Sequence, residues 1–241
     1  NETNYQSELV NVQKFKANLD GHPFFVVPKA FPEISTPSVL ALEFMDGVSL
    51  NDWIASNPCE QDKIIVAHQL LDLFFKELFD WKIVQTDPNL ANYLVQTNPL
   101  KIVLLDFGSC LSYTSDFVEN YRSFVALSQS QDKAKTLQAA VDFELLDSRE
   151  TEEALDAFVQ MLHISSLPFL SSNQPFNFSS LDYERQSRQS ILNFVKKLKY
   201  TPPPRKILFM HRRLGGLFNT LKKMKIAIDL GPYWEKLQKG G

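Results

Sequence analysis

Hydrophobic positions in the first twenty residues recur every three to four positions, which is the period of an amphipathic helix. They are Tyr5, Leu9, Val12, Phe15 and Leu19. The segment that follows, residues 20–23, reads DGHP, and its Gly and Pro are both residues that stop helices. The pattern therefore predicts one helix over residues 1–20.

Two apolar runs after this helix have the composition of short strands. The first is FFVVP (24–28), and the second is Val39–Met45, which ends at the turn pair Asp46-Gly47. Ser49 stands where its hydroxyl can cap a short helix that runs through Ile54.

A second long helix is predicted to start at residues 57–60. Asn57 would be the capping side chain, Pro58 the first helical position and Glu60 the acidic third position. The helix would run to about Trp81, and its apolar face consists of Ile64, Ala67, Leu71, Phe74, Phe75 and Leu78.

The pattern changes to a loop and a hairpin over residues 85–107. NYLVQ (92–96) and LKIVLLDF (100–107) are predicted strands, joined by TNP. From Ser115 the signal is nearly all helical, and DSRETEEALDAFVQMLHI (147–164) is predicted as one helix. Loops are expected at 165–180 and 200–206. Because the strands are few and hairpin-linked, the fold class is α+β rather than a parallel βαβ array.

Composition is that of a soluble globular chain: 241 residues, 44% hydrophobic and 22% charged. The net charge of -3 argues against a nucleic-acid partner, since such proteins are usually basic. No apolar run reaches the length of about 18 residues that a transmembrane helix needs. Cys59 and Cys110 match no disulfide or zinc pattern, and each is predicted to be a buried small hydrophobic residue. The chain begins at Asn1 without Met and inside a predicted helix, so we expect a fragment or a processed piece.

The loop and the hairpin carry the residues with the clearest chemistry. Asp87 and Asn92 lie five positions apart on the loop, and Asp106 ends a hydrophobic strand. Carboxylate and amide oxygens suit Mg²⁺, which usually takes one or two protein ligands in addition to phosphate oxygens. Asp87 can accept a proton from an attacking hydroxyl or orient water. Gly108 lets the backbone turn sharply beside Asp106.

Each piece also has a simpler interpretation. Asp87-Pro88-Asn89 is a good turn sequence, and Asp-Phe-Gly after a strand is often only a turn. The combination of both segments at kinase-like spacing, with VLALEF (39–44) in the place of a hinge strand, favours phosphoryl transfer.

QTDPNLANYL (85–94) together with LLDFGS (104–109) resembles the UbiB family of atypical kinases, the coenzyme-Q-associated proteins of mitochondria and bacteria. That family has Asp-Pro-His/Asn-x-x-Asn in its catalytic loop in place of His-Arg-Asp. Further similar segments are NETNYQSE (1–8), GHPFFVVPKAF (21–31), VLALEFMDGVSL (39–50) and PPPRKILFMHRRLGGLF (202–218), so the resemblance covers nearly the whole chain.

The resemblance implies ATP and Mg²⁺ as cofactors and assigns a role to each matching residue. Asp106 would be the principal magnesium ligand, Asn92 the second ligand and Asp87 the catalytic-loop aspartate. The implied nucleotide-site residues are Glu8, which matches the αC-helix glutamate, Glu2 of an acidic motif, the backbone of Glu43, Phe44 and Met45 at the adenine, and Gly108.

The chain departs from the family pattern in two places. Asn4 stands where the family's acidic motif has Asp, and the chain has neither a glycine- or alanine-rich loop nor the lysine that would pair with Glu8. The implied fold is therefore mostly the helical C-terminal lobe of a protein-kinase-like domain, with the αC helix and the last strands of the N-terminal lobe. Residues 1–45 would be the remainder of the small lobe with its hinge strand, and 46–241 the helical large lobe.

Three functions stay open. The leading one is a UbiB-type kinase or ATPase that supports ubiquinone biosynthesis, and the second is a catalytically silent pseudokinase scaffold that binds lipid or partner proteins. The third is a small-molecule kinase of the aminoglycoside-phosphotransferase type, a class that favours His-Gly-Asp where this chain has Gln85-Thr86-Asp87.

The implied partners are quinone-biosynthesis proteins and an isoprenoid lipid or anionic membrane surface. The implied localisation is cytoplasmic or peripheral membrane in a bacterium and mitochondrial matrix or inner membrane in a eukaryote. HRRLGG (211–216) is interpreted as a helix with solvated arginines or as a phosphate or acidic-lipid site. Two further basic segments are interpreted either as ordinary amphipathic helices or as membrane contacts. They are FVKKLKY (194–200) and LKKMKIAI (221–228).

Overall fold

The computed structural model describes residues 4–130, 132–201 and 205–239. The described chain forms two compact units. The first takes in the described residues up to Ser112 together with Phe209–Thr220, and the second takes in Tyr113–Leu208 and the described residues from Leu221 onward. The predicted lobe boundary at residue 45 is a different division and stays a prediction.

The first unit combines helices with small sheets. Its elements are α1 (Tyr5–Asn18), β1 (Phe25–Val26), η1 (Pro32–Ile34), β2 (Val48–Ser49), α2 (Leu50–Ala55), α3 (Glu60–Phe75), η2 (Lys76–Asp80), β3 (Ile83–Gln85), η3 (Leu90–Asn92), β4 (Tyr93–Thr97), β5 (Leu100–Leu104) and β6 (Cys110–Ser112), to which the middle of α8 (Arg205–Met224) is added. The predicted α+β fold class is confirmed.

Helix α1 confirms the first predicted helix. The Asn4 side chain caps its start by accepting a hydrogen bond from the Gln6 backbone N–H at 3.2 Å. Val12 and Phe15 are buried, as the apolar spacing requires. The Phe15 ring packs 4.8 Å from the Phe107 ring, so α1 lies against the segment that carries Asp106.

The predicted hairpin is also confirmed. Strands β4 and β5 pair antiparallel from Tyr93↔Leu104 to Thr97↔Leu100 and form the centre of a four-stranded sheet ordered β1-β5-β4-β2. Alternate residues face the interior: Tyr93 and Val95 of β4 are buried. This register fixes which residues meet at the hairpin's open end, where Asn92 and Asp106 lie.

A second pairing, between β3 and β6, was not predicted. Its register runs from Ile83↔Ser112 to Gln85↔Cys110. The two strands therefore flank the segment that contains the loop Asp87–Asn92 and the Asp-Phe-Gly turn. Each strand has only three residues, which is too short for a period of two to be recognised. Cys110 is half-buried in this pair, whereas Cys59 is exposed, so the prediction that both cysteines are buried is wrong for Cys59.

The predicted strand Val39–Met45 is wrong. In this segment only isolated bridges form, between Thr36 and Val39 and between Ala30 and Leu42. The facing residues 29–31 lie between Pro28 and Pro32, which have no N–H to donate, so the ladder does not extend. Phe44 is 87% exposed.

The predicted start of the third helix is wrong by two residues. Helix α3 begins at Glu60, and its cap is Cys59, whose Sγ accepts from the Asp62 N–H at 3.4 Å. Asn57 has φ 53°, a left-handed conformation that ends the preceding helix α2 instead. The predicted end near Trp81 is confirmed, since α3 continues into the π-helical turn η2.

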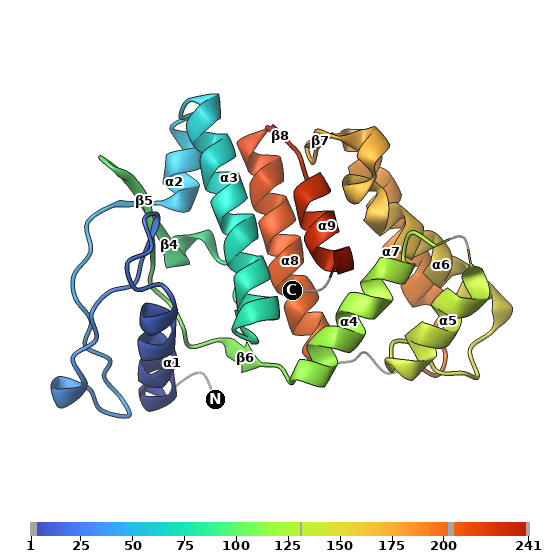
Figure 1. Ribbon diagram of the computed structural model, residues 1–241, viewed down its shortest axis with the longest axis horizontal. Coiled ribbons are helices and arrows are strands. Elements are labelled where there is room, and N and C mark those ends of the chain that lie inside the picture. The colour runs from blue at the N-terminus through green and yellow to red at the C-terminus, as the bar shows by residue number, and fades with distance from the viewer. Residues whose placement is uncertain (1–3, 131, 202–204, 240–241) are drawn as a thin grey trace. The chain divides into compact units, whose positions relative to one another are not determined.

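The second unit is nearly all helical, as predicted after Ser115. Its elements are α4 (Ser115–Leu127), α5 (Lys133–Asp142), α6 (Glu152–Ser166), η4 (Leu167–Phe169), η5 (Ser171–Asn173), β7 (Phe176–Asn177), α7 (Leu181–Lys197), the ends of α8, β8 (Ala227–Ile228) and α9 (Gly231–Lys239). Helices α6 and α7 lie side by side (Figure 1). The antiparallel pair β7–β8 is an exception that the helical pattern did not predict.

The predicted helix 147–164 begins later, at Glu152, because Thr151 caps it through its hydroxyl, which accepts from the Ala154 N–H. An aromatic core holds this unit together, and its buried members are Phe124, Ala140, Leu146, Ala157, Phe158 and Phe194. Within the described residues, no helix is both long and apolar enough to cross a membrane.

Glu150 anchors the segment before α8 and is only 7% exposed. Its Oε1 accepts from the N–H groups of Tyr200 and Thr201 and from the Thr201 hydroxyl, each at 2.8 Å, and Lys199 donates its N–H as well. Burial opposes ionisation of Glu150, but these donors together outweigh it and hold its pKa below the ordinary value of 4.5.

We expect Glu150→Gln to lower the free energy of unfolding by about 2 kcal/mol at pH 7, because charge-assisted hydrogen bonds are replaced by neutral ones. Since the folded pKa is lowered, this stabilisation is present above pH 4.5 and is lost as the pH falls through the folded value. Urea unfolding at pH 7 and at acidic pH measures both effects. Glu153→Gln, at an exposed position nearby, is the control. Equal stability of Glu150→Gln and wild type at pH 7 would contradict the expectation.

Candidate functional site

The loop after β3 brings Asp87 and Asn92 together. The Asn89 side chain accepts from the Ala91 N–H at 3.1 Å and starts the short 3-10 turn η3, which ends at Asn92. That turn directs the Asn92 amide back to Asp87, and Nδ2 donates to Asp87 Oδ2 at 2.9 Å. The spacing of five residues thus produces a direct contact between two predicted site residues.

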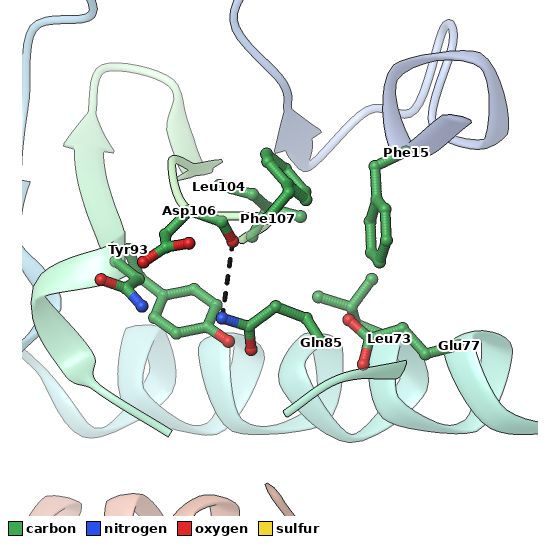
Figure 2. Close-up of a pocket in the computed structure, with 9 residues that line it drawn as sticks. Phe15, Leu73, Glu77, Gln85, Tyr93, Leu104, Asp106 and Phe107 are labelled. Atoms are coloured by element: carbon green, nitrogen blue, oxygen red, sulfur yellow. Dashed lines mark hydrogen bonds between the residues drawn. The ribbon is translucent and has the colours of Figure 1, made fainter. Parts of the chain in front are cut away.

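Asp106 reaches the same place through the hairpin register. The Leu105 N–H donates to the Asn92 carbonyl at 3.0 Å, so the residue after it lies next to Asn92. Asn92 and Asp106 line one small pocket. Figure 2 shows Asp106 in this pocket. Asp106 Oδ1 accepts from the Gly108 N–H at 2.8 Å, and this bond holds the carboxylate on its own turn. The structure therefore brings together three of the predicted site residues at the open end of one hairpin.

Helix α1 holds the peptide groups of Phe107. Glu8 Oε1 accepts from the Phe107 N–H at 3.3 Å, and Asn11 Nδ2 donates to the Phe107 carbonyl at 3.0 Å. Glu8 and Asn11 are three positions apart, so they lie on one face of the helix. Sequence reasoning missed Asn11; the available signal was its helical spacing from Glu8.

Two carboxylates, those of Glu8 and Asp106, lie close to Gly108. Burial raises the pKa of Glu8, the Phe107 N–H opposes this shift, and the Asp106 charge adds to it. A Cβ placed on Gly108 would lie 3.3 Å from Glu8 Oε2 and 3.4 Å from Asp106 Oδ1, so both carboxylates flank this one residue. An arrangement of two carboxylates is stabilised by a cation.

The oxygens available at this point fit magnesium. Asn92 uses its NH₂ group for Asp87, which leaves the amide oxygen as the ligand atom. Asp106 uses Oδ1 for Gly108, which leaves Oδ2. No cluster of three or more His, Cys, Asp and Glu residues suited to a metal occurs in the described parts of the chain. Two hard oxygen ligands are nevertheless what Mg²⁺ takes when phosphate oxygens complete its shell.

The wall behind the site is buried and polar. Figure 2 shows the Gln85 amide pointing to the backbone of Asp106, whose carbonyl accepts from Nε2 at 3.4 Å. Glu77 and Arg213 are also buried, and Glu77 Oε2 lies 3.6 Å from Arg213 Nε. Burial raises the pKa of Glu77 to about 7 against the opposing charge of Arg213.

The remaining predicted residues lie apart from this centre or outside the described residues. Glu43 holds Lys29: its N–H donates to the Lys29 carbonyl at 2.8 Å, and its carboxylate accepts from the Lys29 N–H. An adenine contact at Glu43 would therefore use its carbonyl oxygen. The assignment of Phe44 and Met45 to adenine stays a prediction. Glu2 and the three prolines of 202–204 lie outside the described residues.

A helix that contacts an Asp-Phe-Gly turn, and a loop Asp and Asn beside it, define a kinase-like protein. The model of the ABC1 atypical kinase-like domain matches residues 1–140. The chain belongs to this family, the UbiB family of atypical kinases.

Relatives of known name agree with this membership. The chain is 31% identical over 224 residues to "Atypical kinase COQ8B, mitochondrial" of Danio rerio and 26% identical over 237 residues to "Atypical kinase COQ8, mitochondrial" of Saccharomyces cerevisiae. These alignments cover 93% and 98% of this chain but only 35% and 47% of the two relatives. The chain thus spans less than half the length of either protein.

A solved structure shares the fold. It is described as the complex of Rv3197 with erythromycin from Mycobacterium tuberculosis, and it superposes with a TM-score of 0.75 at 18% identity. The match covers 98% of this chain and 58% of that one. The likeness establishes a common fold; erythromycin is a ligand of that protein.

Proposed function

We propose that this chain belongs to a magnesium-dependent, ATP-binding kinase or ATPase of the UbiB type. The observation that carries the proposal is the convergence of Asp87, Asn92 and Asp106 at the open end of the β4–β5 hairpin. Phosphoryl transfer depends mainly on positioning and charge neutralisation, and these three side chains are of the types that perform both.

Each of these residues has a stated task in this proposal. Asp106 and Asn92 would hold Mg²⁺, which when bound would neutralise charge on the phosphates of ATP. Asp87 orients the attacking water or hydroxyl, and its Oδ2 is fixed by Asn92 for that task. Glu8 and Asn11 keep the Phe107 peptide in place, so that Asp106 presents its carboxylate to the site. The adenine would bind at Glu43–Met45, between the small-lobe remainder (1–45) and the large lobe (46–241).

The process served is proposed to be ubiquinone biosynthesis, in mitochondria if the source is a eukaryote. The names of the relatives support this proposal, since several are mitochondrial COQ8 atypical kinases. Proteins of quinone biosynthesis and an isoprenoid lipid or anionic membrane surface are the corresponding partners.

A pseudokinase scaffold is the second candidate. The observation that favours it is Glu8, which forms no ion pair with a lysine within the part of the chain that the structure describes and hydrogen-bonds to Phe107 instead. A scaffold would keep the fold and bind lipid or protein without turnover.

The deciding experiment measures ADP release by the full-length protein with magnesium or with EDTA, in the presence and absence of vesicles that contain a quinone-like lipid. We expect turnover that requires magnesium. No turnover, together with no shift in melting temperature on adding Mg·ATP, would refute the enzymatic proposal and leave the scaffold.

A further inference from the structure

One face of the middle of α8 contacts the loop Asp87–Asn92. Arg212 Nη2 lies 3.3 Å from Asp87 Oδ1, in a hydrogen-bonded ion pair. Gly216, four residues later, lies against Pro88. Residues four apart on a helix are neighbours, so a single face of α8 contacts the consecutive residues Asp87 and Pro88.

Gly216 is required for this close approach. A methyl group on its Cα would overlap the Pro88 ring, whereas the same group on the preceding Gly215 would meet nothing within 4 Å. A glycine inside a helix costs about 1 kcal/mol relative to alanine. The contact with Pro88 gives a reason for accepting that cost at position 216.

Arg213 sets the rotation of the helix. Its side chain is 4% exposed, pairs with Glu77 and lies with its guanidinium 5.6 Å from the Tyr93 ring centroid. Tyr93 directly follows Asn92, so α8 is attached to both ends of the loop. With Arg213 held inside, the neighbouring Arg212 is left at the surface, 57% exposed, beside Asp87.

The two oxygens of Asp87 therefore have separate donors. Asn92 donates to Oδ2 from within the loop, and Arg212 donates to Oδ1 from α8. Donors on both oxygens fix the plane of a carboxylate, which a single bond does not. The loop Asp87–Asn92 reads DPNLAN and contains no cationic residue, so a cationic donor to Asp87 has to come from elsewhere in the chain.

We propose that Arg212 is a positioning residue for Asp87, and that Gly216 is the residue that lets α8 deliver it. This inference rests on the proposed function, because it concerns how the Asp87 carboxylate is oriented toward the attacking water or hydroxyl. Arg212 acts only through its ion pair with Asp87. Within HRRLGG (211–216), Arg212 and Gly216 thereby have a role at the loop.

The first test compares Arg212→Ala, Arg212→Lys and, as control, Arg205→Ala at an exposed arginine of the same helix. Misplacing a reacting group by about 1 Å costs on the order of 10²-fold in rate. We expect Arg212→Ala to lower kcat for magnesium-dependent ADP release by about 30- to 100-fold and to change KM for ATP less than threefold. Arg212→Lys should recover part of the loss, and the control should match wild type.

The second test uses adjacent glycines. Gly216→Ala should lower kcat at least as much as Arg212→Ala, whereas Gly215→Ala should leave it unchanged. Both substitutions raise helix propensity equally, so only the contact with Pro88 distinguishes them. Equal kinetics for the two alanine variants would overturn the role of Gly216.

Hydrogen exchange of the backbone over residues 85–92 provides a readout that does not need turnover. We expect faster exchange there in Arg212→Ala and Gly216→Ala than in the controls. If wild type turns over and Arg212→Ala turns over equally well, the positioning role is refuted while the proposed function stands. If wild type shows neither turnover nor a shift in melting temperature with Mg·ATP, the proposed function fails, and unchanged exchange in Arg212→Ala then refutes the positioning role separately.

Discussion

Asp106→Asn is expected to lower magnesium-dependent ATP turnover of the full-length protein by about 10³-fold, which corresponds to about 4 kcal/mol of transition-state stabilisation. The substitution removes the negative charge that would hold the metal. Asn keeps an Oδ1 that can still accept from the Gly108 N–H, so the turn after β5 should persist. The loss should appear in kcat with an unchanged melting temperature.

Asp20→Asn is the matched control, since Asp20 is an exposed carboxylate just beyond the end of α1. Steady-state ADP release over a magnesium titration distinguishes the two variants. A rate for Asp106→Asn within tenfold of wild type would contradict the metal-holding role. A lower melting temperature without nucleotide would instead show that Asp106 serves mainly the turn.

Glu77→Ala is expected to destabilise the protein by about 3–5 kcal/mol, because it leaves the Arg213 guanidinium buried without its carboxylate. Removing both charges should cost much less: the double variant Glu77→Leu with Arg213→Met replaces the pair by apolar groups of similar length. Urea unfolding of the single and double variants measures the difference. Because α8 is attached through Arg213, the single variant should also speed hydrogen exchange over residues 85–92.

An exposed ion pair provides the control for this prediction. Asp156→Ala breaks the surface pair between Lys133 and Asp156, and such pairs contribute about 0–1 kcal/mol. If Glu77→Ala and Asp156→Ala destabilise equally, Arg213 is not held by Glu77. If the double variant is no more stable than Glu77→Ala, a loss of packing rather than an unpaired charge is the cause.

The elements that sequence reasoning predicted correctly are those with local causes. Helix α1 follows from the spacing of Val12 and Phe15, and the β4–β5 hairpin follows from two apolar runs around a turn. The contact between Asp87 and Asn92 is of the same kind, since a short turn of six residues produces it.

The elements that were predicted wrongly depend on partners elsewhere in the chain. The run Val39–Met45 has strand composition, but the prolines around residues 29–31 deny it a ladder. The pair β3–β6 is made of strands too short to recognise singly, and it exists because the loop between them returns to the same place. Helix α3 begins later than predicted because Asn57 adopts a left-handed conformation that ends α2.

The sequence by itself determined the α+β class, because that class follows from the hydrophobic pattern of helices and strands. It also determined the family resemblance and singled out Asp87, Asn92 and Asp106 as candidate site residues, because these are contained in short motifs. Only the tertiary structure decided what surrounds them. The hold of Asn11 on Phe107 and the pairing of Arg212 with Asp87 join positions 96 and 125 residues apart. Such contacts leave no period or spacing in the sequence, because chain packing and not local conformation brings them together.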